Sequence, residues 1–427
     1  MKHQFKYLIL LFALILPVLS PAQDTLHKSE QLPAYDSLKL LYPFLMPEKN
    51  NICGDLTSLI PFFQKLEKTE LRDKGQVVVV HIGDSHVQAG YITQPLRVGL
   101  QEQFGNAGIG IIFPYRVAKS NGPPGYLTVA DTPWIASRSA DIHGTLPTGI
   151  SGFTLWSNQT SPSFTVEFTS PEVFGNGASQ ITVFHAPRNN SLAFSIINEI
   201  NGLPYPVIDS LKDNSTTFRL EDHPEKIRIR GIRKNDSLLS ATFYGMSLQS
   251  EAPGVIVHTI GVNGATFANY LRSEHFVEQL VQLNPNLLIF SLGTNEAASY
   301  KTFEPETFKA TIDSLMLNIR NAGIKAAIMF TTPPGIYKSI RKKRRTSWVP
   351  NPVADTVSII LRDYASANSM TYWDWFSIMG GATAMAKWKS KKMTDKRYIH
   401  FTSKGYGIQG MFLLEAINQS YKNYKNP

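Results

Sequence analysis

The chain has 427 residues, more than one compact domain usually contains and enough for two. Its hydrophobic content of 43% and charged content of 18% are typical of globular proteins with a buried core, and they exclude a disordered chain. The formal net charge of +9 becomes +7 without Lys2 and Lys6, because 40 basic residues then stand against 33 acidic ones. A basic surface suits an acidic partner, but no nucleic-acid-binding motif occurs, so no nucleic-acid partner is expected.

The N-terminal segment has the composition of a secretory signal peptide. Lys2 and Lys6 precede an almost wholly apolar run from Tyr7 to Val18, and Ser20-Pro21-Ala22 offers small residues where a signal peptidase cleaves. The apolar run is shorter than the roughly 20 residues that span a bilayer, which disfavours the alternative, a membrane anchor. We therefore expect residues 1–22 to be removed on export, leaving a periplasmic or secreted protein without a transmembrane segment.

A helix, a strand and a second helix are predicted before residue 105. Apolar residues recur at helical spacing from Ser58 to Leu71. The mostly β-branched run Gln76–Ile82 is typical of a strand that is buried on both faces. The segment Val87–Phe104 is amphipathic and stops at Gly105, which predicts a helix.

Between about Trp134 and Leu248 the pattern changes to short alternating strands separated by Asn, Asp, Pro and Gly clusters. Seven strands are predicted: Phe153–Trp156, Ser163–Phe168, Gln180–His185, Leu192–Ile197, Thr216–Leu220, Lys226–Ile232 and Leu239–Met246. Their spacing indicates an antiparallel β-sandwich or jelly roll that is inserted into an α/β domain.

After residue 250 buried strands alternate with helices again. Strands are predicted at Val255–Ile260, Asn286–Leu292, Ala326–Thr331 and Met370–Phe376, and helices at Pro305–Ala322, Val353–Ala367 and Lys404–Tyr421. This alternation predicts a doubly wound α/β layer with a parallel sheet. The expected organisation is a signal peptide (1–22), a first α/β part (23–130), the β insert (131–250) and a second α/β part (251–427).

The first motif that can carry chemistry is His81-Ile82-Gly83-Asp84-Ser85-His86, which follows a buried strand and opens a helix. The Ser85 hydroxyl is then expected at the carboxyl edge of the sheet, beside a helix N-terminus that stabilises developing negative charge. The alternative is that Asp84 and Ser85 only cap the helix.

Two further motifs follow the next two strands of the α/β part. Gly261-Val262-Asn263-Gly264-Ala265 contains glycines that allow a backbone N–H to approach a bound oxygen atom. Gly293-Thr294-Asn295-Glu296 offers an Asn amide as a donor. Together with the Ser85 N–H, these groups would supply three donors to an oxyanion. The alternative is that both motifs are ordinary turns.

The last motif is Tyr398-Ile399-His400-Phe401-Thr402, just before the C-terminal helix. A neutral imidazole near Ser85 could take the hydroxyl proton as a general base. A lone histidine is usually structural, so His400 becomes a candidate because of the three motifs that precede it.

In this order the four motifs resemble the four blocks of the SGNH (GDSL-type) hydrolase superfamily, which carry Ser, Gly, Asn and His. The resemblance covers roughly residues 24–130 and 250–427. It implies a flavodoxin-like fold, Ser85 as nucleophile, His400 as base, and an oxyanion hole made of the Ser85 N–H, the Gly264 N–H and the Asn295 side chain. It implies neither a metal nor a cofactor. The α/β-hydrolase fold is disfavoured because no Gly-x-Ser-x-Gly elbow occurs.

A narrower resemblance is to the peptidoglycan O-acetylesterase branch of that superfamily. It depends on His86 in place of the usual Leu, on the run from Gly105 to Gly110, on the β insert, and on the segment from Trp373 to Trp388. It implies an exported esterase that removes O-acetyl groups from a glycan, preferably peptidoglycan, with an insert that resembles a carbohydrate-binding module. The alternatives are an esterase for other acetylated polysaccharides or short-chain esters, and a catalytically impaired glycan-binding protein of the envelope.

The chain departs from the family pattern in front of His400. SGNH enzymes usually carry Asp three residues before the histidine, where this chain has Arg397, while Asp395 lies five residues before it. A local bulge could bring Asp395 to the imidazole, or a backbone carbonyl could orient it. The third possibility is an impaired site.

Other candidates carry weaker signals. His81 and His86 flank Ser85, but no third ligand motif is near, so no metal is expected. Cys53 is the only cysteine, which excludes an internal disulfide. The basic run Arg341–Arg345 is predicted as a loop, either at the rim of the catalytic face or simply solvated. Four aromatic residues of the insert are candidates either for stacking on sugars or for the core: Trp134, Trp156, Phe184 and Tyr205.

Overall fold

The computed structural model describes residues 32–71, 75–169, 178–210, 212–233, 236–342 and 345–426. The predicted signal peptide, residues 1–22, lies outside these ranges. Within the described part, no helix combines the length and the apolar composition needed to cross a bilayer.

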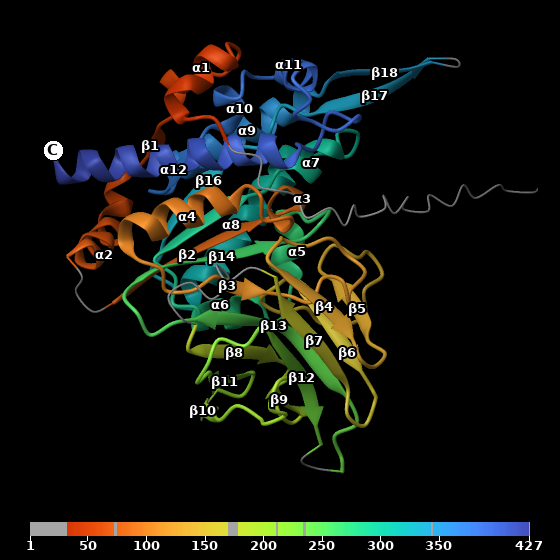
Figure 1. The fold of residues 1–427 in the computed structure, drawn as a ribbon. Helices are drawn as coiled ribbons and strands as arrows, with labels where there is room; N and C mark the ends of the chain where they lie inside the picture. The colour runs from red at the N-terminus through yellow and green to blue at the C-terminus, as the bar shows by residue number, and fades with distance from the viewer. Residues whose placement is uncertain are drawn as a thin grey trace, which may run out of the picture. The chain divides into compact units, whose positions relative to one another are not determined.

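A mixed six-stranded sheet organises the α/β part of the chain (Figure 1). Its order is β1-β19-β16-β15-β2-β14, and only β1 runs antiparallel to its neighbour. The bounds are β1 Ile52–Gly54, β2 Gln76–Gly83, β14 Gly254–Gly261, β15 Leu287–Ser291, β16 Ala327–Thr331 and β19 Thr371–Trp373. The parallel strands thus have the 2-1-3-4-5 order of flavodoxin-like sheets, whose ligands bind at the carboxyl ends where the order reverses. In this chain the order reverses at β2 and β15.

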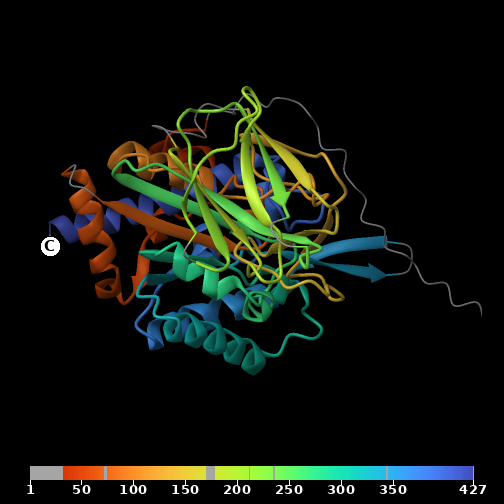
Figure 2. The ribbon, with the colours of Figure 1, turned by 90° about the horizontal axis from the view of Figure 1, so that it is seen from below.

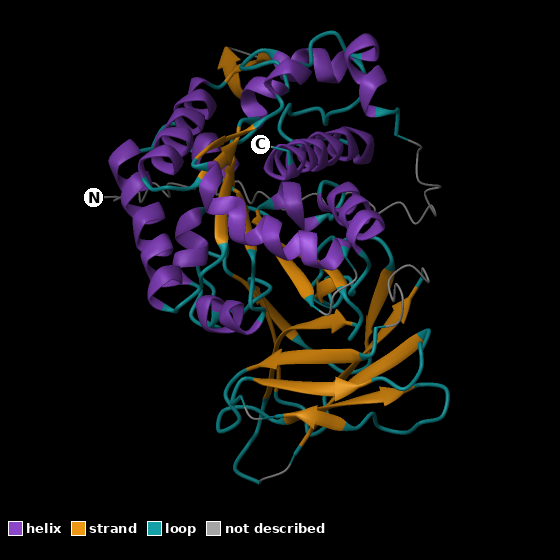
Figure 3. Ribbon diagram, turned by 90° about the vertical axis from the view of Figure 1, so that its left-hand side faces the viewer, coloured by secondary structure: helices purple, strands orange, loops and turns teal. Residues whose placement is uncertain are grey.

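Helices cover both faces of this sheet (Figures 1 and 3). One face carries α2 (Ile60–Glu70), α4 (Thr93–Phe104) and α12 (Ser403–Lys425), and the other carries α5 (Phe267–Arg272), α8 (Pro305–Asn321) and α9 (Pro352–Ala367). Val77 and Val79 of β2 pack on the first face, and Val78 and Val80 on the second. The predicted parallel α/β sheet is therefore confirmed. Its strands are rich in β-branched residues because they are buried on both faces.

The remaining helices are short. They are η1 Tyr35–Ser37, α1 Leu38–Leu41, η2 Pro47–Lys49, η3 Leu56–Leu59, α3 Ser85–Gln88, α6 Phe276–Gln282, α7 Thr294–Ala298, α10 Trp375–Ile378 and α11 Ala384–Ser390. The helix predicted over 87–104 is thus two helices, because the chain turns through Gly90 at a φ of 77°. The strand predicted over 370–376 ends at Trp373, because Asp374 accepts a hydrogen bond from Ser377 N and caps α10.

Two antiparallel sheets lie between β2 and β14 in the chain, gathered away from the helices (Figure 3). The larger contains β3 Gly110–Ile112, β5 Ile135–Arg138, β6 Phe153–Ser157, β8 Gln180–His185, β10 Val207–Asp209, β11 Ser215–Arg219 and β13 Ala241–Gln249. The smaller has the order β4-β7-β12-β9, with bounds β4 Tyr126–Ala130, β7 Ser163–Phe168, β12 Lys226–Ile232 and β9 Ala193–Asn198. All seven predicted strands are present, and β4, which precedes residue 131, already belongs to the smaller sheet.

Aromatic side chains join these two sheets face to face. Phe243 of β13 packs against Phe164 of β7 and Phe194 of β9, with ring centroids 5.1 and 5.8 Å apart. The larger sheet is tied to the α/β part by β3, which pairs with β13 while the neighbouring Asn106 bridges to Val255 of β14.

Arg341, Lys342 and Arg345 of the basic run belong to two paired β-strands, so the prediction of a loop is wrong for these residues. Strand β17 (Tyr337–Lys342) pairs antiparallel with β18 (Arg345–Pro350), and the pair extends away from the helices in two views (Figures 1 and 2). The register pairs Tyr337 with Pro350, Ser339 with Trp348 and Ile340 with Ser347, and the neighbouring basic residues obscured this pattern in the sequence.

Candidate active site

Ser85 begins the short helix α3 at the carboxyl end of β2. Asp84 precedes it as N-cap, with its Oδ1 accepting a hydrogen bond of 2.9 Å from His86 N. The helix packs so closely on the strand ends that a Cβ on Gly261 would lie 2.2 Å from Gln88 N, and one on Gly83 would lie 2.4 Å from Val87 Cγ2. These glycines therefore bring the helix onto the sheet and fix the position of Ser85, which remains partly exposed.

His400 lies against Ser85, although 315 positions separate them in the chain. Its Nε2 is 2.9 Å from Ser85 Oγ. The histidine lies just before α12, whose N-cap Thr402 accepts a hydrogen bond from Gly405 N. The hydroxyl can thus donate to a neutral imidazole, which is the arrangement that a serine nucleophile requires.

Asp395 reaches the other side of the same ring. Its Oδ2 is 3.4 Å from His400 Nδ1. The intervening residues form a closed turn, in which Asp395 N donates to His400 O (2.8 Å) and Tyr398 adopts a φ of 58°. The turn accommodates the two extra residues that separate this carboxylate from the histidine, as the predicted bulge requires. The partner of Nδ1 is therefore Asp395 and not the backbone carbonyl that was the alternative.

The same turn keeps Asp395 ionised. Burial raises the pKa of this carboxyl, but the hydrogen bond with His400 and the backbone N–H groups of Ile399 and Arg397 outweigh it and hold the pKa below its ordinary value. Arg397 contributes only its N–H to this arrangement, and its side chain is exposed. A charged acceptor therefore faces Nδ1 at neutral pH.

Two backbone N–H groups point to an oxyanion site. Within the described residues, neither Ser85 N nor Gly264 N donates a hydrogen bond. Gly264 has a φ of 85° in a turn that Gln88 supports, since Asn263 N donates to Gln88 Oε1 (2.6 Å). Gln88 is buried and also donates to Asn121 O. The sequence indicated Gly264 but not Gln88, because a buried amide in a helix has no recognisable spacing.

Asn295 differs from the free donor that was predicted. It lies in α7 after β15, and its Nδ2 donates to Asp84 Oδ2 (3.2 Å) and to Ala265 O (2.8 Å). Both amide hydrogens are therefore used in this structure. Asn295 can join Ser85 N and Gly264 N only by exchanging one of these bonds, and the longer one, to Asp84, is the weaker.

Two carboxyl groups lie behind this site, the buried Asp84 and the partly buried Glu296. Burial raises the pKa of Asp84 to about 7, and it raises the pKa of Glu296 to about 7 with a smaller contribution from Asp84. Glu296 Oε1 accepts from Phe267 N (2.8 Å), whereas its Oε2 is buried without a partner. The pair was not predicted, since the two residues are far apart in the chain.

The two histidines that flank Ser85 are core residues. His81 is fully buried between Thr93 Oγ1 (2.9 Å) and Ser291 Oγ (2.7 Å), and burial lowers its pKa to about 3. His86 is buried beside His400, with ring centroids 5.3 Å apart, and its Nδ1 contacts the Tyr406 hydroxyl at 3.0 Å. Among the described residues, no cluster of three or more His, Cys, Asp or Glu could hold a metal ion.

Three of the four aromatic candidates of the insert serve the core. Phe184 and Tyr205 are buried, and Tyr205 donates to Asp222. Trp134 donates to Ser163 O (3.1 Å) and packs against Phe164. Trp156 alone of the four lines a pocket.

Comparisons with known proteins agree with this geometry. The model of the GDSL-like lipase/acylhydrolase family matches residues 235–408, which include Gly264, Asn295, Asp395 and His400 but not Ser85. The sequence matched no curated protein. The family match over residues 235–408 and the fold support an SGNH hydrolase, and with it a carboxylic ester hydrolase.

Within that class, a solved peptidoglycan O-acetylesterase is similar over almost its whole length. It aligns with a TM-score of 0.71 at 19% identity, covering 87% of this chain and 99% of that one. An acetyl xylan esterase (TM-score 0.30, 16% identity) covers 38% of this chain and 81% of its own. A carbohydrate acetylesterase from Sinorhizobium meliloti (TM-score 0.29, 14% identity) covers 39% and 79%. The first of these is similar in fold to most of this chain.

Proposed function

We propose that the protein is an exported serine esterase that removes O-acetyl groups from a glycan, preferably peptidoglycan, through an acyl-enzyme on Ser85. The observation that carries this proposal is the hydrogen-bonded series Ser85–His400–Asp395, together with the backbone N–H groups of Ser85 and Gly264, which donate to no described residue. No cofactor or metal takes part in the proposed reaction.

In the first half of the reaction, Ser85 Oγ attacks the acetyl carbonyl carbon while His400 Nε2 takes the hydroxyl proton. The carbonyl oxygen becomes negatively charged and accepts hydrogen bonds from Ser85 N and Gly264 N. Asn295 exchanges its bond with Asp84 for a third bond to this oxygen. The bond to the sugar oxygen then breaks, and that oxygen receives the proton from His400.

In the second half, His400 takes a proton from water, and the resulting hydroxide attacks the acetyl carbon on Ser85. The tetrahedral intermediate collapses to acetate, and His400 returns the proton to Ser85 Oγ. Asp395 keeps the Nδ1 proton in place throughout and stabilises the imidazolium in both halves.

The proposed substrate class is supported by the fold similarity to the peptidoglycan O-acetylesterase and by the two antiparallel sheets of this chain. We propose that these sheets form an inserted jelly-roll domain, predicted over 131–250 between α/β parts at 23–130 and 251–427, and that it docks the glycan. An esterase for other acetylated polysaccharides or short-chain esters is the second candidate. The alternative of a catalytically impaired binding protein depended on the lack of a carboxylate partner for His400. Because Asp395 lies within reach of His400, this alternative is disfavoured.

Export to the periplasm or the medium is part of the proposal, and it depends on residues 1–22 of the sequence. N-terminal sequencing of the protein recovered from cell fractions tests it. A mature chain that starts near residue 23 outside the cytoplasm supports export, and an intact N-terminus in the cytoplasm contradicts it.

The test of the catalytic proposal is acetate release from O-acetylated peptidoglycan, from acetylated xylan and from an aryl acetate. We expect release from peptidoglycan to be fastest and to vanish in Ser85→Ala. Faster release from xylan would favour the second candidate. Absence of release from all three substrates by a folded protein would overturn the esterase proposal.

A further inference from the structure

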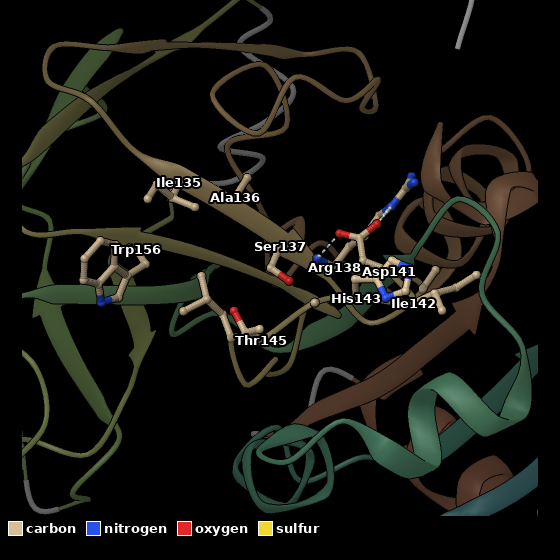
Figure 4. A pocket seen from close by; sticks show the side chains of 12 residues that line it. Ile135, Ala136, Ser137, Arg138, Asp141, Ile142, His143, Thr145 and Trp156 are labelled. Carbon is tan, nitrogen blue, oxygen red and sulfur yellow. Dashed lines mark hydrogen bonds and ion pairs between the residues drawn. The ribbon is translucent and has the colours of Figure 1, made fainter. Parts of the chain in front are cut away.

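A pocket of about 720 Å³ opens between strands β5 and β6 and the segment after β5. This volume lies within the range of about 300–1,000 Å³ that is typical of small-ligand sites. Figure 4 shows Trp156 at one end of the pocket and Arg138 with Asp141 at the other. None of its residues belongs to the Ser85–His400–Asp395 series.

One side of this pocket adjoins the oxyanion site. Ala140, which lines the pocket, is so near Gly264 that a Cβ built on that glycine would lie 3.8 Å from the Ala140 Cβ. The segment is held there by Asn269 of α5, whose Nδ2 donates to Ser139 O (2.9 Å). The pocket therefore begins beside Gly264.

The lining of the pocket indicates an uncharged ligand. Asp141 accepts from Arg138 twice, with Oδ1 2.7 Å from Nε and Oδ2 3.0 Å from the backbone N. This ion pair leaves no uncompensated charge for an anionic group. The other functional groups are the hydroxyls of Ser137 and Thr145, the imidazole of His143 and the indole of Trp156.

Two of these groups lack a partner. The Ser137 side chain is only 8% exposed, and its Oγ has no hydrogen-bond partner in the described structure. Gly144 lies close beside it, since a Cβ there would come within 2.9 Å of that oxygen. The partly exposed Trp156 likewise donates no hydrogen bond to any described residue, unlike Trp134, which donates to Ser163 O. An aromatic face beside unpaired hydrogen-bonding groups suits a ligand with an apolar face and a hydroxylated edge.

We propose that this pocket is a glycan subsite that holds a neutral pyranose ring of the chain whose acetyl group lies at Ser85. The ring stacks on Trp156, and one of its hydroxyls pairs with Ser137 Oγ. The inference rests on the proposed function, because it assigns the position of a second sugar of the same substrate.

The test compares a polymer with a small ester. Trp156→Leu should lower kcat/KM for O-acetylated peptidoglycan about tenfold, through KM, and leave hydrolysis of an aryl acetate unchanged. Ser137→Ala should lower it less without destabilising the fold, since the hydroxyl has no partner to lose. Trp134→Phe, outside the pocket, is the matched control and should change neither substrate.

A direct binding measurement separates this inference from the catalytic one. Ser85→Ala is titrated by calorimetry with peptide-free, O-deacetylated glycan strands, with and without Trp156→Leu. Weaker binding in the double variant is expected. Equal binding, or an equal loss on polymer and aryl acetate in Trp156→Leu, would overturn the subsite. Failure of the esterase proposal would appear instead as absent hydrolysis of every ester by the unaltered protein.

Discussion

At the scale of single residues, the turn in front of His400 brings a carboxylate to the imidazole from an unusual position in the sequence. Asp395 is two residues farther from the histidine than the family pattern expects, and Tyr398 enters the left-handed region to close the turn. Tyr398 also stacks on Tyr337 of β17, with ring centroids 4.9 Å apart. The packing of this ring explains how a tyrosine is held at a positive φ.

Replacement of Asp395 tests whether it orients His400. Asp395→Asn should lower kcat for an aryl acetate by about 10²- to 10⁴-fold, because the amide can present a donor to Nδ1 and favour the wrong tautomer. Arg397→Ala, which removes a side chain outside the turn's hydrogen bonds, is the control and should retain activity. Steady-state kinetics of both variants decide the matter. Similar activity of Asp395→Asn and the unaltered protein would leave Ser85 and His400 as a dyad.

The partly buried Glu296 predicts a pH-dependent stability. Its pKa is about 7 in the folded protein, above the ordinary value, so the native state binds a proton that the unfolded state has lost. Stability from this group is therefore full below about pH 4 and is lost as pH rises toward 7. Glu296→Gln lacks this loss. The free energy of unfolding of the variant minus that of the unaltered protein should therefore be larger at pH 8 than at pH 5, by on the order of 1–3 kcal/mol.

Denaturant unfolding of Glu296→Gln at the two pH values measures this difference. Glu306→Gln, an exposed change on α8, is the control and should show little pH-dependent effect. An equal stability difference between Glu296→Gln and the unaltered protein at both pH values would contradict a protonated Glu296.

At the scale of elements, two glycines at and just after the end of β14 are required for different reasons. Gly261 has no room for a Cβ, whereas the space beside Gly264 is open and its constraint is a φ of 85°. Gly261→Ala should push α3 from the sheet and destabilise the protein by several kcal/mol. Gly264→Ala should cost only about 1 kcal/mol in stability but lower kcat, because the strained backbone moves its N–H.

Thermal unfolding and kinetics of the two variants check this contrast. If Gly264→Ala kept full activity, its N–H would not be an oxyanion donor. If Gly261→Ala were as stable as the unaltered protein, the close approach of α3 to β14 would not fix the position of Ser85.

The sequence predicted helices and strands well where the periodic spacing of apolar residues is enough to identify them. The parallel strands and the long helices α8, α9 and α12 were found because their apolar residues repeat over many positions. The break between α3 and α4 was missed because the amphipathic pattern continues across Gly90, where the backbone turns. Hairpin β17–β18 was missed because its cluster of basic residues outweighed the alternation on either side.

Of the site, the four motif residues were predictable because each follows a strand end or precedes a helix. Their mutual distances were not, since 315 residues separate Ser85 from His400. The bonds of Asn295 to Asp84 and Ala265, and the support from Gln88, depend on tertiary packing that no local pattern encodes.

At the scale of the whole molecule, one of the two apolar clusters joins the α/β part with the antiparallel sheets. The same cluster contains Val80 of β2 and Phe243 of β13, and the chain from Leu32 to Pro427 forms one compact unit. We therefore expect one cooperative unfolding transition. Phe243→Ala should lower the stability of the whole chain by about 3–5 kcal/mol.

Scanning calorimetry and tryptophan fluorescence of Phe243→Ala test this coupling. Coincident transitions at a lowered temperature are expected from both probes. A separate early transition would show that the antiparallel sheets unfold independently of the α/β part.

The central claim is that Ser85 is the nucleophile of an esterase site. A fluorophosphonate that modifies activated serines should label one residue, and peptide mass spectrometry should find the label on Ser85, in step with loss of ester hydrolysis. Labelling should be slower in Asp395→Asn and absent in Ser85→Ala. Full hydrolytic activity after complete labelling of Ser85, or inactivation with the label on another residue, would contradict the account.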